Sequence, residues 1–239
     1  MAYSEERIDR IAGTSRPIFP QDQDLIKVIA RKGRLLTLSD ARALIKLVKL
    51  LFDQSGIQAG FQPALLRALT TKFRDAGRRS APWKPASSKV PGRPQDGSDG
   101  NRINRWLMPE DHKFYANEID ATLVEIKYYL QAFSMLNAPK SQYDIKDIFT
   151  PWLVKHEIVP GAYRDPVQRI QINFIEFINE PRLIQSGHLD PLDRDGRHVP
   201  ENTYLMLYRS NQIQGNMKME ELIDLMTKIV EDYKNNPFT

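Results

Sequence analysis

Apolar residues recur at three- and four-residue spacing in the first third of the chain, which predicts helices that each bury one face. Ser39 is the predicted N-cap of one helix, with Asp40 in its first turn and Gly56 at its end. Its buried face would comprise Ala43, Leu44, Leu47, Val48, Leu51 and Phe52. Pro63 stands where the first residue of a second helix belongs, ahead of Leu65, Leu66, Leu69 and Phe73.

The middle of the chain predicts more helix, interrupted by prolines. Residues 109–136 carry an apolar face at helical spacing, and residues 167–178 fit a helix better than a strand by their length and flanks. Pro151, Pro160 and Pro166 divide the intervening chain into short pieces. No internal repeat is visible, so we expect a mainly α, or α+β, protein.

The last quarter of the chain has a different pattern. Residues 182–189 and 203–210 are strand candidates, and the loop between them is rich in Asp, Gly and Pro. Residues 219–233 follow as an amphipathic helix, whose apolar face would comprise Leu222, Ile223, Leu225, Met226, Ile229 and Val230. The predicted order is therefore strand, loop, strand, helix.

Composition removes several classes of site. The 239 residues include no cysteine, which excludes a disulfide scaffold, a cysteine zinc site and a thiol nucleophile. The four histidines are far apart in the sequence, so a site with three histidine ligands would need nearly all of them. No apolar run approaches the roughly 20 residues of a membrane span, and the polar N-terminus does not resemble a signal peptide. We expect a soluble, cytoplasmic protein with no membrane partner.

The positive charge is concentrated in residues 72–105. The chain has a formal net charge of +4, and this Pro-, Gly- and Ser-rich stretch holds nine Lys or Arg against three Asp. Two interpretations stay open: a solvated linker, or a basic loop that lies along phosphates through Arg78, Arg79 and Lys84.

Five residues of the last quarter of the chain have a distinctive spacing. His188 ends the first predicted strand; Pro191 follows three residues later, Gly196 eight later and Asn202 fourteen later, and Asn211 stands nine beyond Asn202. With the strand–loop–strand–helix order, the pattern of residues 182–235 resembles the HNH, or ββα-metal, nuclease finger.

The resemblance implies a role for each polar residue. His188 would be the general base that deprotonates the attacking water, a task that suits a neutral imidazole. Asn211 would provide an oxygen ligand for Mg²⁺, or another divalent cation such as Mn²⁺. Asn202 would support the site by tying the loop back. Four further side chains are candidates for phosphate contacts, namely Arg194, Arg197, His198 and Arg209.

The sequence also departs from the family pattern. Most HNH nucleases have an Asp before the catalytic His, as a second metal ligand, and this chain has Gly187. The related non-specific nucleases that do have Gly there carry Asp-Arg before it, where this chain has Gln185 and Ser186. A rival PD-(D/E)xK reading of Asp120 with residues 125–127 needs a strand, in a stretch that predicts a helix.

These inferences combine into one expectation. We expect helical regions at 1–75 and 106–181, a basic linker or DNA-contacting loop at 76–105, and a ββα-metal finger at 182–239. The resemblance implies a Mg²⁺-dependent DNA endonuclease, with a site-specific type II restriction enzyme that acts as a homodimer on double-stranded DNA as the favoured subtype. A non-specific or homing-type HNH nuclease and an inactive DNA-binding module remain alternatives.

Overall fold

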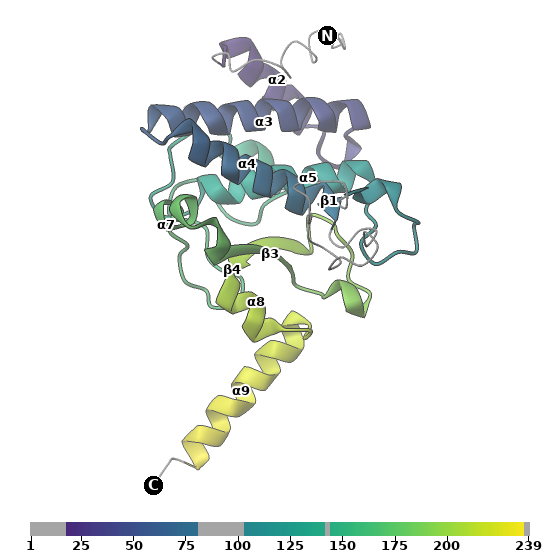
Figure 1. The fold of residues 1–239 in the computed structure, drawn as a ribbon, viewed down its shortest axis with the longest axis vertical. Coiled ribbons are helices and arrows are strands. Elements are labelled where there is room, and N and C mark those ends of the chain that lie inside the picture. Colours follow the sequence, from purple (N-terminus) through teal and green to yellow (C-terminus); the bar gives the residue numbers. More distant parts are fainter. Residues whose placement is uncertain (1–17, 81–102, 142–143, 237–239) are drawn as a thin grey trace, which may run out of the picture.

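A layer of packed helices sits above a small β-hairpin in the structure, a computed structural model that describes residues 18–80, 103–141 and 144–236. The layer contains α2 (Pro20–Ala30), α3 (Leu38–Gln58), α4 (Pro63–Gly77) and α5 (Glu118–Phe133) (Figure 1). The short helices α6 (Lys146–Phe149) and α7 (Phe174–Asn179) flank it. The mainly helical fold class is therefore confirmed.

The core forms where α3, α4, α5 and α7 meet. The Phe52 ring lies at its centre and packs edge-on against Phe73, Tyr129, Phe133 and Phe174. Helix α5 is buried from Ala121 to Phe133, its polar residues included, because it passes between the other helices and the hairpin. A helix that is buried all round is typical of the centre of a domain.

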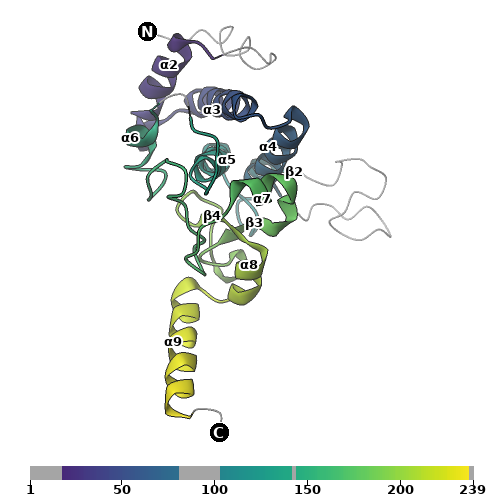
Figure 2. The ribbon, with the colours of Figure 1, turned by 90° about the vertical axis from the view of Figure 1, so that its left-hand side faces the viewer.

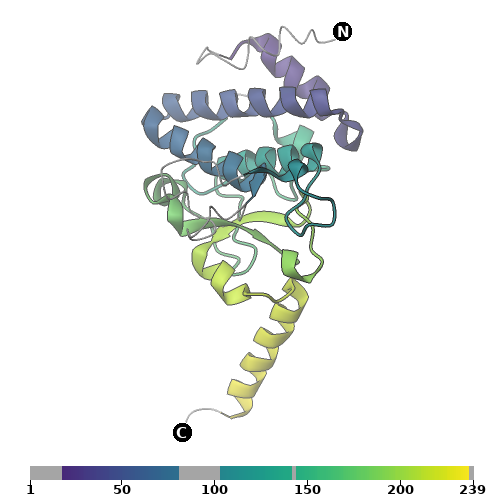
Figure 3. The same ribbon diagram turned by 45° about the vertical axis from the view of Figure 1, so that its right-hand side comes forward.

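Two antiparallel strands make up the hairpin below this layer. β3 (Ile184–His188) pairs with β4 (Thr203–Leu207) in a register that sets Ile184 opposite Leu207 and His188 opposite Thr203. Buried polar groups of α5 hold the hairpin: Gln131 Oε1 accepts from the Leu205 amide at 2.9 Å, and the hydroxyls of Tyr128 and Ser186 are hydrogen-bonded. Figure 3 shows the hairpin between the helical layer and the last two helices.

The helix that completes the ββα arrangement differs from the predicted one. Helix α8 (Tyr208–Gln214) begins directly after β4, so the second strand ends at Leu207 and Asn211 lies on this helix. Helix α9 (Met219–Asn235) matches the predicted amphipathic segment but projects from the body (Figures 1 and 2). The C-terminal ββα order is confirmed, with α8 as its helix.

Several predicted boundaries are also corrected. Thr37, and not Ser39, caps α3 through a bond to the Asp40 amide, and the helix continues past Gly56 to Gln58. Pro63 does begin α4. The segment 109–136 is helical only from Glu118, where Asn117 provides the cap. Within 167–178 the helix begins at Phe174, because the preceding residues are held in β-bridges by Leu136 and Arg164.

The basic stretch 72–105 is not a linker at either end. Its first residues continue α4 to Gly77, and β1 (Arg79–Ser80) pairs antiparallel with β2 (Ile103–Asn104). Lys84 and the rest of the stretch between these strands lie outside the described residues.

Candidate active site

A cleft of about 840 Å³ opens where the hairpin meets the end of α4 and helix α8. Its walls include His188, Asn211, Gln185, Lys72, Arg79 and Arg105. Three of these residues are cations: Lys72 lies on α4, Arg79 lies on β1, and Arg105 directly follows β2. The cleft therefore brings the candidate base and the candidate metal ligand together with positive charge.

His188 and His198 form a hydrogen-bonded pair beside this cleft. His188 Nε2 lies 3.0 Å from His198 Nδ1, and His198 Nε2 lies 2.7 Å from the Gly77 carbonyl oxygen at the end of α4. His198 is fully buried. Burial lowers the pKa of His188 to about 3 and that of His198 well below its ordinary value, and the positive charge of Arg105 lowers both further. Both imidazoles are therefore neutral at pH 7.

This chain of hydrogen bonds assigns the tautomer of each ring. The Gly77 carbonyl can only accept, so His198 carries its proton on Nε2 and presents a bare Nδ1. His188 must then donate from Nε2, which leaves its own Nδ1 unprotonated. Among the described residues, no group bonds to that Nδ1. The two hydrogen bonds therefore determine that Nδ1 is the nitrogen of the neutral His188 ring that has the free lone pair.

Asn202 ties the loop that follows His188, as the resemblance implies. Its Oδ1 accepts from the Asp190 amide at 2.7 Å, and its Nδ2 donates to the carbonyls of Asp190 and Arg197 at 2.9 Å. Gly196 serves the same loop, since a Cβ there would stand 2.0 Å from the Asp190 carbonyl oxygen. The loop therefore closes tightly, with its start at Asp190 bonded to its end at Asn202.

Gln214 holds the backbone of the candidate base directly. Its side-chain amide is buried and donates to the carbonyls of His188 and Leu189 at 2.8 and 3.0 Å, and to that of Met217 at 3.1 Å. The structure shows that Gln214 links α8 to the end of β3.

Asn211 projects from α8 toward β3. Its Nδ2 donates to Gln185 Oε1 at 2.9 Å, and no described residue donates to its Oδ1. At Gly187 a Cβ would lie 2.4 Å from the side chain of Met206, so the family's Asp does not fit this packing unless Met206 moves. On β3, Gln185 is the residue whose side-chain oxygen is hydrogen-bonded to Asn211.

Arg105 is a buried cation on the wall of the same cleft. Its guanidinium donates to the carbonyls of Phe114 and Ala76 at 3.1 and 3.4 Å, and no described residue is hydrogen-bonded to its buried Nε. Burial lowers its pKa to about 10, and it remains charged at pH 7. Within the described ranges no carboxylate pairs with it. A buried charge without a counterion is costly, so this position is suited to an anion.

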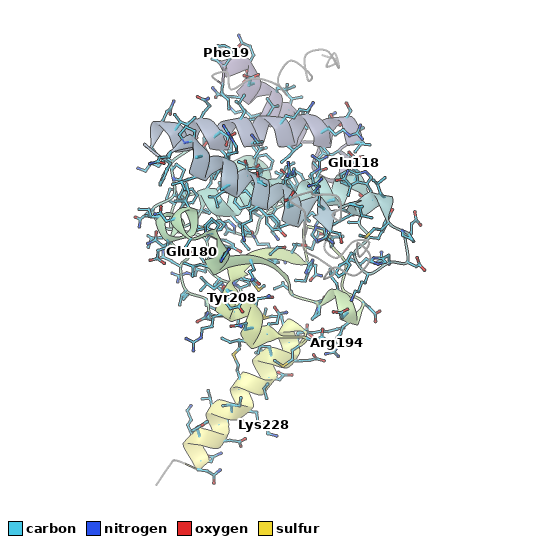
Figure 4. The ribbon with its side chains drawn as sticks, in the orientation of Figure 1. Phe19, Glu118, Glu180, Arg194, Tyr208 and Lys228 are labelled. Carbon is cyan, nitrogen blue, oxygen red and sulfur yellow. The ribbon has the colours of Figure 1, made fainter. Side chains whose placement is uncertain are left out.

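The other predicted phosphate-contacting residues are spread out. Arg79 lines the cleft and lies 3.5 Å from Asp75, whereas Arg78 turns to Glu125 at 3.8 Å and stacks on Trp106. Arg194 pairs with Glu221 at the root of α9 (Figure 4), and the exposed residues Arg197 and Arg209 do not line the cleft. His198 is a correction: it is buried with both ring nitrogens engaged, which leaves none for a phosphate.

The rival carboxylate–lysine motif does not assemble. Glu125 and Lys127 lie on α5, where burial raises the pKa of Glu125 to about 7 and lowers that of Lys127 to about 7. Glu125 faces Arg78, whereas Lys127 donates to the Pro200 carbonyl. The two side chains therefore point to different neighbours.

The described residues contain neither a cluster of metal-ligating side chains nor a helix suited to cross a membrane. No group of three or more His, Cys, Asp or Glu side chains there is placed to hold a metal ion. No described helix combines the length and the apolar character that crossing a membrane requires.

Comparisons with known proteins give a structural likeness but no match to a family model or a curated protein. Its structure is similar to a chain described as the crystal structure of a type II restriction endonuclease, with a TM-score of 0.43 and 18% sequence identity. The match covers 55% of this chain and 62% of that chain, which is less than two thirds of its length.

Proposed function

We propose that this chain is a divalent-metal-dependent DNA endonuclease of the HNH type. The observation that carries the proposal is the hydrogen-bonded order Gly77–His198–His188, which presents a neutral base beside a cleft that also contains the buried cation Arg105. Hydrolysis of a phosphodiester needs a base that activates water and positive charge that stabilises the transition state, and the cleft offers both.

His188 is the general base in this proposal. Its Nδ1 takes a proton from water, the water oxygen bonds to phosphorus, and the bond from phosphorus to the 3′-oxygen breaks. The leaving 3′-oxygen takes up a proton from solvent. The products are a 5′-phosphate and a 3′-hydroxyl. A base with a low pKa is weak, but an incoming phosphate would offset the charge of Arg105, which is one cause of the low pKa of His188. Substrate binding would therefore strengthen the base.

Arg105 is proposed to hold the scissile phosphate. Its guanidinium is fixed by two backbone carbonyls, and its positive charge has no paired carboxylate among the described residues, so a phosphate in the cleft would supply the missing counterion. The other cations on the wall, Lys72, Arg79 and Arg182, outnumber its carboxylates, Asp75 and Asp193, and this positive excess favours the entry of a polyanion. Asn202 and Gln214 keep the backbone around His188 in place.

The donor set of the cleft fits a weakly held, hydrated Mg²⁺. Asn211 Oδ1 is free to ligate, Gln185 provides a second amide oxygen, and no carboxylate cage is formed by the described residues. Mg²⁺ keeps several waters and accepts few protein ligands of this kind. When bound, the cation would stabilise the charge that develops on the phosphate and on the leaving oxygen.

The subtype that we propose is a site-specific type II restriction endonuclease that acts on double-stranded DNA as a homodimer. Palindromic sites match the two-fold symmetry of such a dimer. The basic segment that follows α4, with Arg78, Arg79 and Lys84, would lie along the DNA backbone.

One experiment tests the activity. Plasmid DNA is incubated with the wild-type protein and with His188→Ala, each with and without Mg²⁺, and the ends of any product are mapped. We expect Mg²⁺-dependent discrete fragments from the wild type and a loss of roughly 10²-fold or more in the variant. His112→Ala, at an exposed histidine outside the cleft, is the control. Wild-type cleavage by His188→Ala would remove this base from the mechanism.

A DNA-binding module without catalysis is the second candidate. Gly187, where the family has a metal-ligating Asp, favours it. Binding of duplex DNA with no cleavage at any Mg²⁺ or Mn²⁺ concentration would select this candidate, and a smear of products would select a non-specific nuclease.

A further inference from the structure

Helix α9 exposes an apolar face to solvent. Ile223, Met226, Ile229 and Val230 are 36–52% exposed, and Leu225 on the edge of the face is 43% exposed. The helix projects away from the rest of the molecule in every view (Figures 1, 2 and 3). An isolated helix of this length is marginal in water, so such a helix is normally stabilised by a partner.

The root of α9 is fixed firmly to the candidate site. Leu222 is buried, the Met219 amide donates to the Leu189 carbonyl at 3.1 Å, and Glu221 pairs with Arg194. Leu189 directly follows His188. The direction in which α9 leaves the body is therefore set by the same loop that holds the base.

The apolar positions of α9 have the spacing of a helix-pairing seam. Met219, Leu222, Met226 and Ile229 follow one another at intervals of three, four and three residues, as in the first and fourth positions of a heptad. Leu222 is already buried within its own chain, so Met226 and Ile229 are the exposed positions of this seam. Ile223 and Val230 widen this seam on one side, and Leu225 widens it on the other. A helix with this pattern is suited to pack along another helix.

We propose that α9 is the dimer interface of this protein and pairs antiparallel with α9 of a second copy, with Met226 at the two-fold axis. The inference deepens the proposed homodimer by naming its interface. A helix of 17 residues is about 25 Å long, so a pair buries an area near the lower limit of roughly 1,000 Å² for a stable interface. We therefore expect a concentration-dependent dimer.

The charges along both edges of the apolar face select the antiparallel direction. With Met226 at the centre, Lys218 lies beside Asp232 of the partner subunit on one edge. On the other edge Glu220 lies beside Lys234 of the partner subunit. The two-fold axis repeats each pair. A parallel dimer would instead bring the acidic first turns, with Glu220 and Glu221, close to each other and align the two helix dipoles.

Sedimentation velocity of the full chain without DNA measures this interface, so the result does not depend on nuclease activity. Met226→Glu places two like charges at the axis, and we expect it to raise the dimer dissociation constant at least tenfold. Lys228→Glu is the control, because this residue lies on the opposite face of the projecting helix (Figure 4). It should leave the dissociation constant nearly unchanged.

A charge exchange tests the direction. Lys218→Glu alone should weaken the dimer several-fold, and the combination with Asp232→Lys should restore it. Circular dichroism of each variant checks that the helix content is kept. A monomeric wild type at tens of micromolar, or a dimer insensitive to Met226→Glu, would overturn the interface. A dimer that is lost with Met226→Glu but not restored by the charge exchange would overturn the antiparallel register.

Discussion

His188 Nε2 lies 3.0 Å from His198 Nδ1, and the second ring continues the contact to the Gly77 carbonyl, 121 residues away in the sequence. The two histidines belong to the hairpin and to its loop, whereas Gly77 ends α4. The pair therefore connects the ββα segment to the helical layer, and it decides which nitrogen of His188 is free. A neutral imidazole can act as a base only through its unprotonated nitrogen.

Removal of the His198 acceptor should allow His188 to adopt either tautomer. In His198→Phe nothing accepts from His188 Nε2, and we expect a mixture of tautomers and a fall in cleavage of about tenfold or more. His198→Asn keeps an oxygen acceptor near the former Nδ1 and should retain more activity. ¹⁵N NMR of the four histidine rings measures the tautomer directly. A wild-type His188 that is protonated on Nδ1 would contradict the assignment, even if the protein cleaves DNA.

Arg105→Met should weaken binding of duplex DNA and reduce the slope of log affinity against log salt by about one unit, because one phosphate contact is lost. The same change removes a positive charge that lowers the pKa of His188, so this pKa should rise. Titration of labelled duplex at several salt concentrations and NMR titration of His188 provide the two measurements. Arg31→Gln at the end of α2 is the matched control. An unchanged salt slope would separate Arg105 from phosphate binding.

Asn211→Ala should raise the Mg²⁺ concentration that is required for half-maximal cleavage and lower the maximal rate, since a weakly held cation loses an oxygen ligand. Asn211→Asp keeps that oxygen and adds charge, so it should retain activity. Cleavage rates across a Mg²⁺ series check both. Gln212→Ala, on an exposed position of the same helix, is the control. If Asn211→Ala keeps the wild-type metal dependence, this residue does not ligate the metal.

The buried histidine should make stability depend on pH. The pKa of His198 is held well below its ordinary value in the folded chain, whereas histidine titrates near 6.5 in the unfolded chain. Below about pH 6.5 the unfolded chain binds the additional proton, so the free energy of unfolding falls as the pH decreases. One such residue contributes a slope of up to about 1.4 kcal/mol per pH unit.

Urea unfolding of the wild type and of His198→Phe between pH 4.5 and 8 measures this contribution. Glu125, with its pKa raised from 4.5 to about 7, acts in the opposite direction, because its stabilising effect is lost as the pH rises through this range. The variant keeps Glu125, so the difference between the two curves isolates the histidine. Parallel curves would show that His198 does not stay neutral in the folded state.

Local signals were enough for much of the secondary structure. The apolar spacing predicts α3, α4, α5 and α9, and the strand that ends at His188 is where the pattern of residues 182–189 places it. The loop spacing also singled out Asn202, whose side chain accepts from the Asp190 amide, and its role in supporting the site stays a prediction. Boundaries were less accurate: Thr37 caps α3 two residues before the predicted cap Ser39, and α5 begins only at Glu118, behind its cap Asn117.

The placement of the helix with Asn211 needed the structure. Residues 203–210 alternate as a strand would, and the turn from β4 to α8 at Leu207 is decided by packing: the Leu207 amide bonds to Asp165, and the Asp165 carboxylate also accepts from Ser210. These contacts join residues more than forty positions apart.

The sequence by itself determined that most of α3, α4, α5 and α9 is helical, the order of the last strands, and the spacing of His188, Asn202 and Asn211. The tertiary structure decided that Arg105 reaches the same cleft, that His198 is buried behind the base, and that the apolar face of α9 stays exposed. The physical reason is how far apart in the sequence the interacting residues lie. Periodicity and capping depend on neighbours within a few residues, whereas burial and the partner of a charge depend on which distant segments pack together.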